Sequence, residues 1–261
     1  MDFGIKDKVA LVTGAGGGLG GAIAQALARE GAQVVVADIH EESAARIVKA
    51  IQDEGGRAMP LILDLGKIDE MASHIDTIRT RLGDVDILVN NSGGPPPSPA
   101  SGIAPNVWES HFRAMVLNLM HLTDLVLPGM RSRKWGRIIT STSSGVVAPI
   151  ANLGISNALR LALVGWSKTL AREVAADGVT VNVILPGRIA TARIRQLDEA
   201  KAEREGKPLE QIIQESTSTI PVGRYGQVKE YGDVAAFLAS GPASYITGSI
   251  TRVDGGLISS I

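Results

Sequence analysis

The amino-acid sequence predicts a single α/β domain, residues 1–261, built on a parallel seven-stranded sheet with helices on both faces. Seven short, mostly apolar runs alternate along the chain with longer amphipathic stretches, and this alternation is typical of βαβ units. The short runs are nearly all apolar, as expected for parallel strands that are buried on both faces. At 261 residues, the chain is close to the largest size that one hydrophobic core serves.

The elements follow one another in a regular order. The predicted strands are Val9–Thr13, Gln33–Ala37, Ala58–Leu63, Ile87–Asn90, Arg137–Thr140, Thr180–Leu185 and Ile250–Val253. The predicted helices are Leu19–Glu30, Glu41–Glu54, Ile68–Leu82, Asn106–Arg131 and Leu153–Asp177, with a further one beginning near Lys229. Right-handed crossovers place these helices on both faces of the sheet. Ligands of such sheets bind beyond the carboxyl ends of the strands, so the residues after each strand are the first functional candidates.

Two segments interrupt this order. Gly93–Pro99 contains three consecutive prolines, which exclude a helix or a central strand, and we expect a stiff loop that roofs a pocket. Arg188–Arg224 is charged and contains a helix-like stretch, Leu209–Ser216. A long insertion at the carboxyl edge of a sheet is typical of a lid. We therefore expect a substrate lid at about 188–224; a solvated surface hairpin is the alternative.

The composition narrows the class of partner. The chain has 26 basic and 27 acidic residues, a net charge of −1 and no cysteine. Such a charge balance does not recruit nucleic acid or acidic membranes, and the lack of cysteine excludes disulfides and thiolate metal sites. No stretch reaches the roughly 18 apolar residues of a membrane span. We expect a cytoplasmic protein that binds a small molecule, with no metal, nucleic acid or membrane involved.

The first strand runs directly into a glycine-rich turn, Thr13-Gly14-Ala15-Gly16-Gly17-Gly18-Leu19-Gly20, which opens the next helix. Glycines let the backbone approach a pyrophosphate, and the helix N-terminus directs N–H groups toward it. The turn therefore predicts a Rossmann-like, doubly wound domain that binds a dinucleotide through Gly14, Gly18, Leu19 and Gly20. A glycine run alone also occurs in ordinary strand-to-helix turns.

Asp38 ends the second strand, 18 residues beyond Gly20. A carboxylate here can accept hydrogen bonds from both adenosine ribose hydroxyls and would repel a 2′-phosphate. Ile39 and His40 follow, and the glycine loop contains no Lys or Arg, so we expect no cation to neutralise such a phosphate. The sequence thus favours NAD(H) over NADP(H). Alternatively, Asp38 is an N-cap for the helix that starts at Glu41.

Several motifs in the same order resemble the short-chain dehydrogenase/reductase family over essentially the whole chain. They are Thr13-Gly14-x-x-x-Gly18-x-Gly20, Asn90-Asn91-Ser92-Gly93, Pro186-Gly187 and Tyr245-Ile246-Thr247-Gly248 with Val253-Asp254-Gly255-Gly256. The family usually has Ala at the position of Ser92, which is a mild departure. The resemblance implies a homotetramer. It also implies further cofactor contacts, from Asp64 and Leu65 to the adenine and from Ile189 and Thr191 to the nicotinamide amide. Further residues implied to contact the cofactor are Asn91, Gly93, Pro186 and Gly187.

The resemblance also implies four catalytic residues, of which this chain retains two. Asn118 matches the Asn that holds a relay water, and Ser143 matches the Ser that binds the substrate oxygen, with Ser144 as a fallback. The positions of the Tyr acid/base and the Lys that supports it hold Ser156 and Arg160. Gly165–Ala171 fits the family without a gap, which supports this register. The chain's tyrosines, Tyr225, Tyr231 and Tyr245, lie elsewhere in the sequence.

These two replacements differ in their consequences. Arg160 keeps a cation that can bind ribose hydroxyls and stabilise an oxyanion, but it cannot release a proton. Ser156 is a far weaker acid than a phenol and too short to fill its place, so an ordered water could occupy that space. The leading hypothesis is an NAD(H)-dependent oxidoreductase acting on a carbonyl or alcohol, similar to 3-oxoacyl thioester reductases. Ser143 and Arg160 hold the oxygen, and water carries the proton.

Two other functions remain open. One is a catalytically impaired NAD(H)-binding pseudoenzyme or sensor. The other is a non-redox enzyme of the halohydrin dehalogenase type, which also carries Arg in place of Lys but keeps the tyrosine and replaces the cofactor glycines. At the base of the lid, Arg188, Arg193 and Arg195 could receive a carboxylate or phosphate, or be solvated. His111 and His121 are assigned to helix surface or packing.

Overall fold

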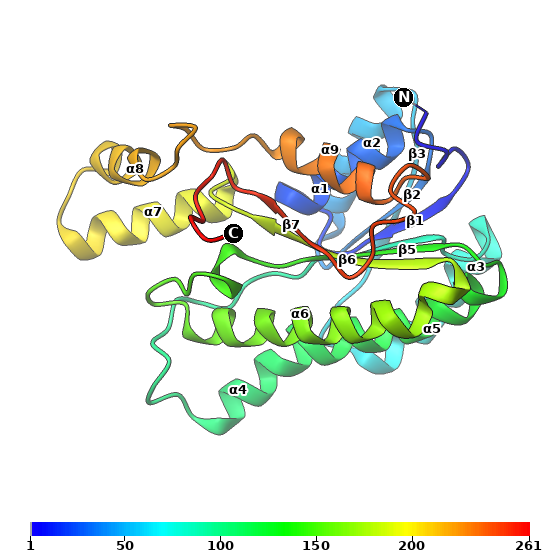
Figure 1. Ribbon diagram of the computed structural model, residues 1–261, viewed down its shortest axis with the longest axis horizontal. Helices are drawn as coiled ribbons and strands as arrows, with labels where there is room; N and C mark the ends of the chain where they lie inside the picture. Colours follow the sequence, from blue (N-terminus) through cyan, green and yellow to red (C-terminus); the bar gives the residue numbers. More distant parts are fainter. Residues whose placement is uncertain (1) are drawn as a thin grey trace.

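Seven parallel strands form one sheet in the order β3-β2-β1-β4-β5-β6-β7 in the computed structural model, which describes residues 2–261 (Figure 1). The strands are β1 (Val9–Val12), β2 (Gln33–Asp38), β3 (Arg57–Ile62), β4 (Ile87–Asn90), β5 (Gly136–Ser141), β6 (Val179–Pro186) and β7 (Ile250–Val253). The strand order reverses between β1 and β4, and this is where such sheets place their ligands. The predicted Rossmann-like, doubly wound architecture is confirmed.

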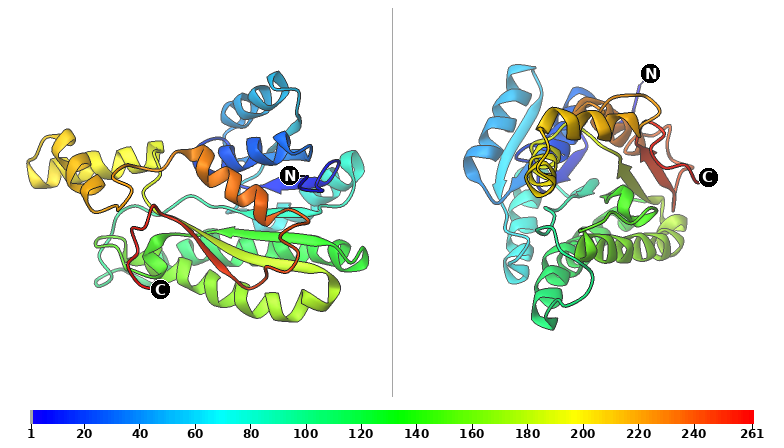
Figure 2. Two further views of the ribbon diagram at one scale, coloured as in Figure 1. Left: turned by 45° about the horizontal axis from the view of Figure 1, so that its top comes forward. Right: turned by 90° about the vertical axis from the view of Figure 1, so that its left-hand side faces the viewer.

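Helices cover both faces of the sheet (Figure 2). The first face packs against α1 (Gly18–Arg29), α2 (Glu41–Asp53) and α9 (Val228–Leu238). The second packs against α3 (Met71–Leu82), α5 (Asn118–Ser132) and α6 (Gly154–Val174). Alternate strand residues enter the two cores: Val34 and Val36 face the first, and Val35 faces the second. Both faces are therefore apolar, and the sequence of β2 shows no polar alternation for this reason.

The predicted helix Asn106–Arg131 is divided in the structure. It consists of α4 (Pro105–Phe112), a π-helical turn over Arg113–Leu117 and α5, which begins at Asn118. π-Turns inserted into helices occur frequently at functional sites, and apolar periodicity does not reveal them. The extra residue of a π-turn rotates the side chains of α5 about the helix axis relative to those of α4.

The segment 188–224 contains two helices, α7 (Ala192–Glu205) and α8 (Leu209–Ser218), where the sequence predicted one helix-like stretch. α7 is mostly charged, and Asp198 is its buried residue, so it carries no apolar stripe that periodicity could detect. The two helices project beyond the carboxyl ends of the strands, at the left of Figure 1.

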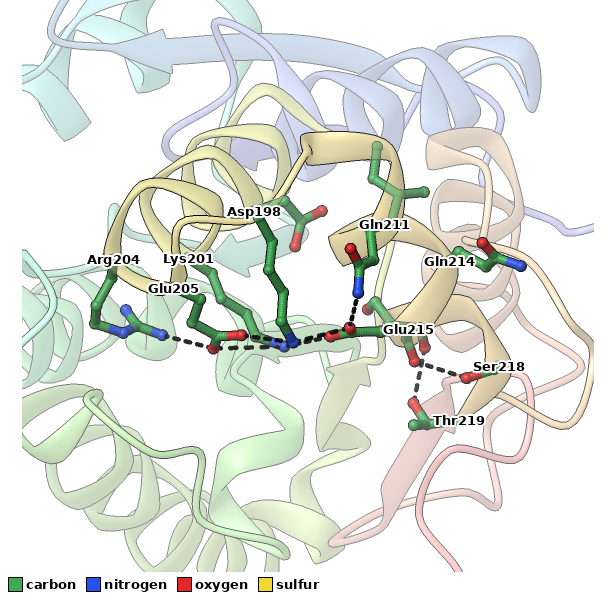
Figure 3. A network of polar contacts seen from close by, with 12 residues as sticks. Asp198, Lys201, Arg204, Glu205, Gln211, Gln214, Glu215, Ser218 and Thr219 are labelled. Atoms are coloured by element: carbon green, nitrogen blue, oxygen red, sulfur yellow. Dashed lines mark hydrogen bonds and ion pairs between the residues drawn. The ribbon is translucent and has the colours of Figure 1, made fainter.

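Ion pairs connect α7 to α8 (Figure 3). Lys207, between the helices, lies 2.9 Å from Glu215 and 3.3 Å from Glu205, and Lys201 lies 3.7 Å from Glu215. Gln211 also donates to Glu215, at 3.0 Å. Each pair is partly exposed, and such pairs are worth about 0–1 kcal/mol. The network therefore holds the two helices together through several weak ion pairs rather than through one strong pair.

A buried carboxylate anchors this pair of helices to the rest of the domain. Asp198 of α7 accepts a hydrogen bond from Arg188 at 2.7 Å and from the Tyr225 hydroxyl at 2.8 Å. Arg188 precedes the two helices and Tyr225 follows them, so one side chain joins both ends of the segment. Among the described residues, no helix is both long and apolar enough to cross a bilayer.

Candidate active site

A cavity of about 1060 Å³ lies beyond the carboxyl ends of the strands. Its walls come from the glycine loop, the ends of β2, β4, β5 and β6, the start of α7 and the C-terminal residues Leu257 and Ile258. Most of the residues predicted from the sequence line this cavity, namely Gly14, Gly18, Leu19, Asp38, Asp64, Leu65, Asn91, Gly93, Ser143, Ser156, Arg160, Pro186, Gly187, Ile189 and Thr191.

Two predicted residues, Gly20 and Asn118, are not part of the cavity wall. A Cβ on Gly20 would come within 2.2 Å of the Gly14 carbonyl oxygen, so this glycine permits close packing of α1 beneath the loop. Asn118 is buried, and neither polar atom of its amide has a hydrogen-bond partner in the described chain. Buried amides are almost always hydrogen-bonded, so the unpaired amide of Asn118 is an exception that a bound water would resolve.

The glycine loop is fixed to the end of β4. The Asn91 N–H donates to the Thr13 hydroxyl at 3.0 Å, and the Asn91 amide donates to the Gly14 carbonyl at 3.1 Å. Gly14 and Gly18 have φ values of +56° and +55°, which side chains disfavour. α1 begins at Gly18 with no side-chain cap on Gly17. Its first N–H groups therefore remain available to an anion in the cavity.

Asp38 braces the same loop. Its carboxylate accepts from the Gly16 N–H at 2.8 Å and from the His40 N–H at 3.0 Å. The N-cap of α2 is His40, without a side-chain cap, so the alternative in which Asp38 caps this helix is wrong. The carboxylate still lines the cavity.

Arg46 of α2 is not among the residues that the sequence predicts beside the glycine loop. Its guanidinium donates to the Gly16 carbonyl at 3.0 Å, although the sequence led us to expect no cation beside this loop. That expectation is wrong because α2 returns along the first face of the sheet and brings Arg46 back to the loop. No motif within the glycine turn reveals it.

Arg160 is the central charge at the other end of the cavity. It is 8% exposed and donates to the Ser141 carbonyl at 3.3 Å, the Ser92 carbonyl at 3.2 Å and the Gly93 carbonyl at 3.4 Å. Burial lowers the pKa of its guanidinium because desolvation disfavours charge. Ser156 lies one helical turn earlier on α6 and is also buried. The spacing i, i+4 places the two side chains on the same helix face.

Ser143 lies on the cavity wall just after β5. Its hydroxyl accepts from the Gly145 N–H at 3.1 Å and caps a short 3₁₀ turn over Ser144–Val146. This contact leaves the hydroxyl proton available for another acceptor. Ser144 also lines the cavity, so both serine candidates lie at this end.

None of the tyrosines lines the cavity. The Tyr225 hydroxyl bonds to Asp198, and burial raises the pKa of this phenol. Tyr231 is buried in α9, where its hydroxyl contacts Ser141 Oγ at 2.9 Å and burial raises its pKa. Tyr245 is fully exposed. Folding therefore brings no tyrosine to the place that Ser156 occupies.

His111 of α4, Arg188 and Arg193 of α7 also line the cavity. The sequence predicts a surface or packing role for His111 and does not distinguish Arg193 from Arg188 and Arg195. The structure distinguishes these arginines: Arg188 pairs with Asp198 at 2.7 Å and Arg195 with Glu199 at 2.8 Å. Arg193 donates to the Pro95 carbonyl at 2.7 Å and forms no ion pair among residues 2–261.

Known proteins resemble this chain along its length. A family model described as enoyl-(acyl carrier protein) reductase matches residues 14–258. The D-β-hydroxybutyrate dehydrogenase of Cupriavidus necator is 34% identical over 255 residues, 97% of this chain and 99% of the relative. The 3-oxoacyl-(acyl-carrier-protein) reductase of Escherichia coli is 37% identical over 260 residues, 98% and 99% of the two chains. L-Sorbose reductase from Gluconobacter frateurii, complexed with NADPH and L-sorbose, has a TM-score of 0.94 and 31% identity, with 100% of both chains covered.

Proposed function

The chain belongs to the short-chain dehydrogenase/reductase family, and we propose that it is an NAD(H)-dependent carbonyl/alcohol oxidoreductase whose active site works without a tyrosine acid. Family membership and its dehydrogenase and reductase relatives make it an oxidoreductase. The finer assignment depends on how the residues of this chain suit a nicotinamide dinucleotide and a substrate oxygen.

The glycine loop suits a dinucleotide. A Cβ on Gly93 would meet nothing within 4 Å, and one on Gly18 would meet only Thr191, at 3.8 Å, so both backbones are open to close approach. The uncapped N-terminus of α1 would hold the pyrophosphate. The bound nicotinamide would supply or accept the hydride.

NAD(H) is the proposed cofactor because Asp38 presents a carboxylate to the cavity. That charge suits ribose hydroxyls and opposes a 2′-phosphate. Arg46 beside the same loop acts in the opposite direction, and the L-sorbose reductase neighbour was solved with NADPH. We propose that Asp38 determines the preference for NAD(H) over NADP(H), since Asp38 lines the cavity and Arg46 does not.

The position of Arg160 is the observation that carries the proposed chemistry. Three neutral carbonyls hold its guanidinium between the ends of β4 and β5, and no carboxylate among the described residues pairs with it. A guanidinium carries five N–H donors, more than these contacts use. Arg160 can therefore bind ribose hydroxyls and, with Ser143, a substrate oxygen that becomes negative as the carbonyl is reduced.

The proton follows a different route from the hydride. Arg160 does not titrate in the accessible range, and a serine hydroxyl is a poor acid. We propose that a water beside Ser156 carries the proton and that the Asn118 amide orients the water chain.

The exposed apolar side chains of Phe112 on α4 and Leu161 on α6 support a homotetramer assembled through these helices.

Cofactor binding and turnover are tested separately. We expect NADH to bind, seen as a change in its fluorescence. We also expect it to be oxidised slowly when ketones or 3-oxoacyl thioesters are added, seen as a loss of NADH absorbance. Alcohols with NAD⁺ test the reverse direction. Tight NADH binding without turnover on any of these compounds would contradict the proposal and indicate a sensor; turnover without a nicotinamide would indicate the dehalogenase class.

A further inference from the structure

Two arginines from different elements lie close to Gly94. A Cβ built on this glycine would lie 3.6 Å from Nη2 of Arg193 and 3.9 Å from Nη2 of Arg160. Arg160 comes from α6 and Arg193 from the first turn of α7. Both line the cavity, so two guanidinium groups share one small region near the proposed reaction site.

Neither cation has a carboxylate partner in the described chain. Arg193 contacts the Pro95 carbonyl, and Arg160 contacts three backbone carbonyls. Besides burial, the charge of Arg193 contributes to lowering the pKa of Arg160, as expected for like charges close together. Arg160 is buried, whereas Arg193 is exposed at the cavity edge. A buried cation without a counter-charge is costly, and an anion placed beside both guanidinium groups offsets part of that cost.

The charges along the cavity are distributed unequally. Its lining carboxylates, Asp38 and Asp64, lie at the end of the glycine loop and β3. The polar residues that line the opposite end are the serines and threonine after β5, His111 and arginines, and apolar side chains such as Met115 and Ile150 lie among them. Arg188 is neutralised there by Asp198, which leaves Arg160 and Arg193 as the uncompensated charges.

We propose that the substrate carries a carboxylate that binds between Arg160 and Arg193, beside the carbonyl that is reduced. This inference rests on the proposed function and narrows its substrate from carbonyl compounds in general to oxo acids or their hydroxy acids. Guanidinium groups match carboxylates through paired N–H···O contacts. Because Arg193 belongs to α7, a carboxylate held by both arginines also ties this helix to the body of the domain.

The test uses a binding reaction that needs no hydride transfer. Acetoacetate and its neutral analogue acetoacetamide are titrated calorimetrically into the protein saturated with NAD⁺, which cannot reduce them. We expect acetoacetate to bind at least tenfold more tightly than acetoacetamide. R193Q should weaken acetoacetate binding by about 10–100-fold, the loss typical of a charge-assisted contact, and leave acetoacetamide unchanged.

R195Q is the matched control, because Arg195 lies two residues away on the same helix, pairs with Glu199 and is not part of the cavity wall. It should bind acetoacetate as the native chain does. Equal binding of acetoacetate and acetoacetamide, no binding of either, or preferential binding of inorganic phosphate overturns the proposal. A loss of NADH affinity in R193Q equal to its loss of acetoacetate affinity also overturns it, since Arg193 would then hold the cofactor. The titrations are repeated with NADP⁺ and without cofactor. The comparison of acetoacetate with acetoacetamide then does not depend on whether NAD(H) is the correct cofactor.

Discussion

Asp38 and Arg46 act on the same residue of the glycine loop with opposite charges. The Asp38 carboxylate accepts from the Gly16 N–H, and the Arg46 guanidinium donates to the Gly16 carbonyl. The sequence motif identified the first and not the second. Asp38 follows a strand at a diagnostic spacing, whereas Arg46 reaches the loop only through the packing of α2.

This pair leads to a prediction about cofactor choice. The native chain should bind NADH more tightly than NADPH, and D38N should reduce that preference by about tenfold or more, because a carboxylate no longer opposes the 2′-phosphate. R46Q should weaken NADPH binding more than NADH binding. Fluorescence titration of both nucleotides measures the ratios. A native preference for NADPH, or an unchanged ratio in D38N, would contradict the role given to Asp38.

At the other end of the cavity, the sequence located Ser156 and Arg160 by register, and the structure supplies their surroundings. The register could not show that Arg160 binds the carbonyls of Ser92, Gly93 and Ser141, because these residues are 19 to 68 positions away in the chain. Nor could it show that Arg193 faces the same cavity. In the sequence, the charged residues of a long insertion cannot be told apart. Folding pairs some of them with opposite charges and leaves others without a charged partner.

Among the elements, the two helices of segment 188–224 depend on Asp198. Its carboxyl is 2% exposed and pairs with Arg188, so removal of its charge leaves a guanidinium without a partner. D198N should destabilise the segment by ~2–4 kcal/mol and raise KM more than it lowers kcat, because α7 carries Arg193. Faster limited proteolysis within 188–224 and a lower Tm would report the local loss.

E199Q provides the comparison on the same helix. It breaks the exposed Arg195–Glu199 pair, and exposed pairs of this kind contribute about 0.3–0.5 kcal/mol. Proteolysis and KM should therefore stay close to native values. If D198N and E199Q behave alike, Asp198 does not anchor the segment 188–224.

For the whole molecule, the fold was the most predictable property. Strands such as Val9–Val12 and Ile87–Asn90 are buried along their full length, and uniform burial leaves a clear apolar signature. α7 escaped detection because ion pairs, not an apolar face, hold it. The π-turn before Asn118 escaped because it changes only the local helical register. The candidate site was predicted where it depends on residues next to strand ends. It was missed where it depends on how helices pack, as with Arg46 beside the glycine loop and His111 on the cavity wall, and Arg193 was named without being distinguished from its neighbours.

We propose that this protein performs hydride transfer with Ser156 and Arg160 in place of an acid and its supporting lysine. The most direct test is the steady-state kcat for ketone reduction by NADH in the double variant S156Y/R160K. General acid catalysis is worth about 10²–10⁴-fold, so kcat should rise by about that factor over a slow native rate. NADH affinity and Tm, measured on the same samples, should stay near native. A folded, NADH-binding double variant with no gain in kcat would contradict the account.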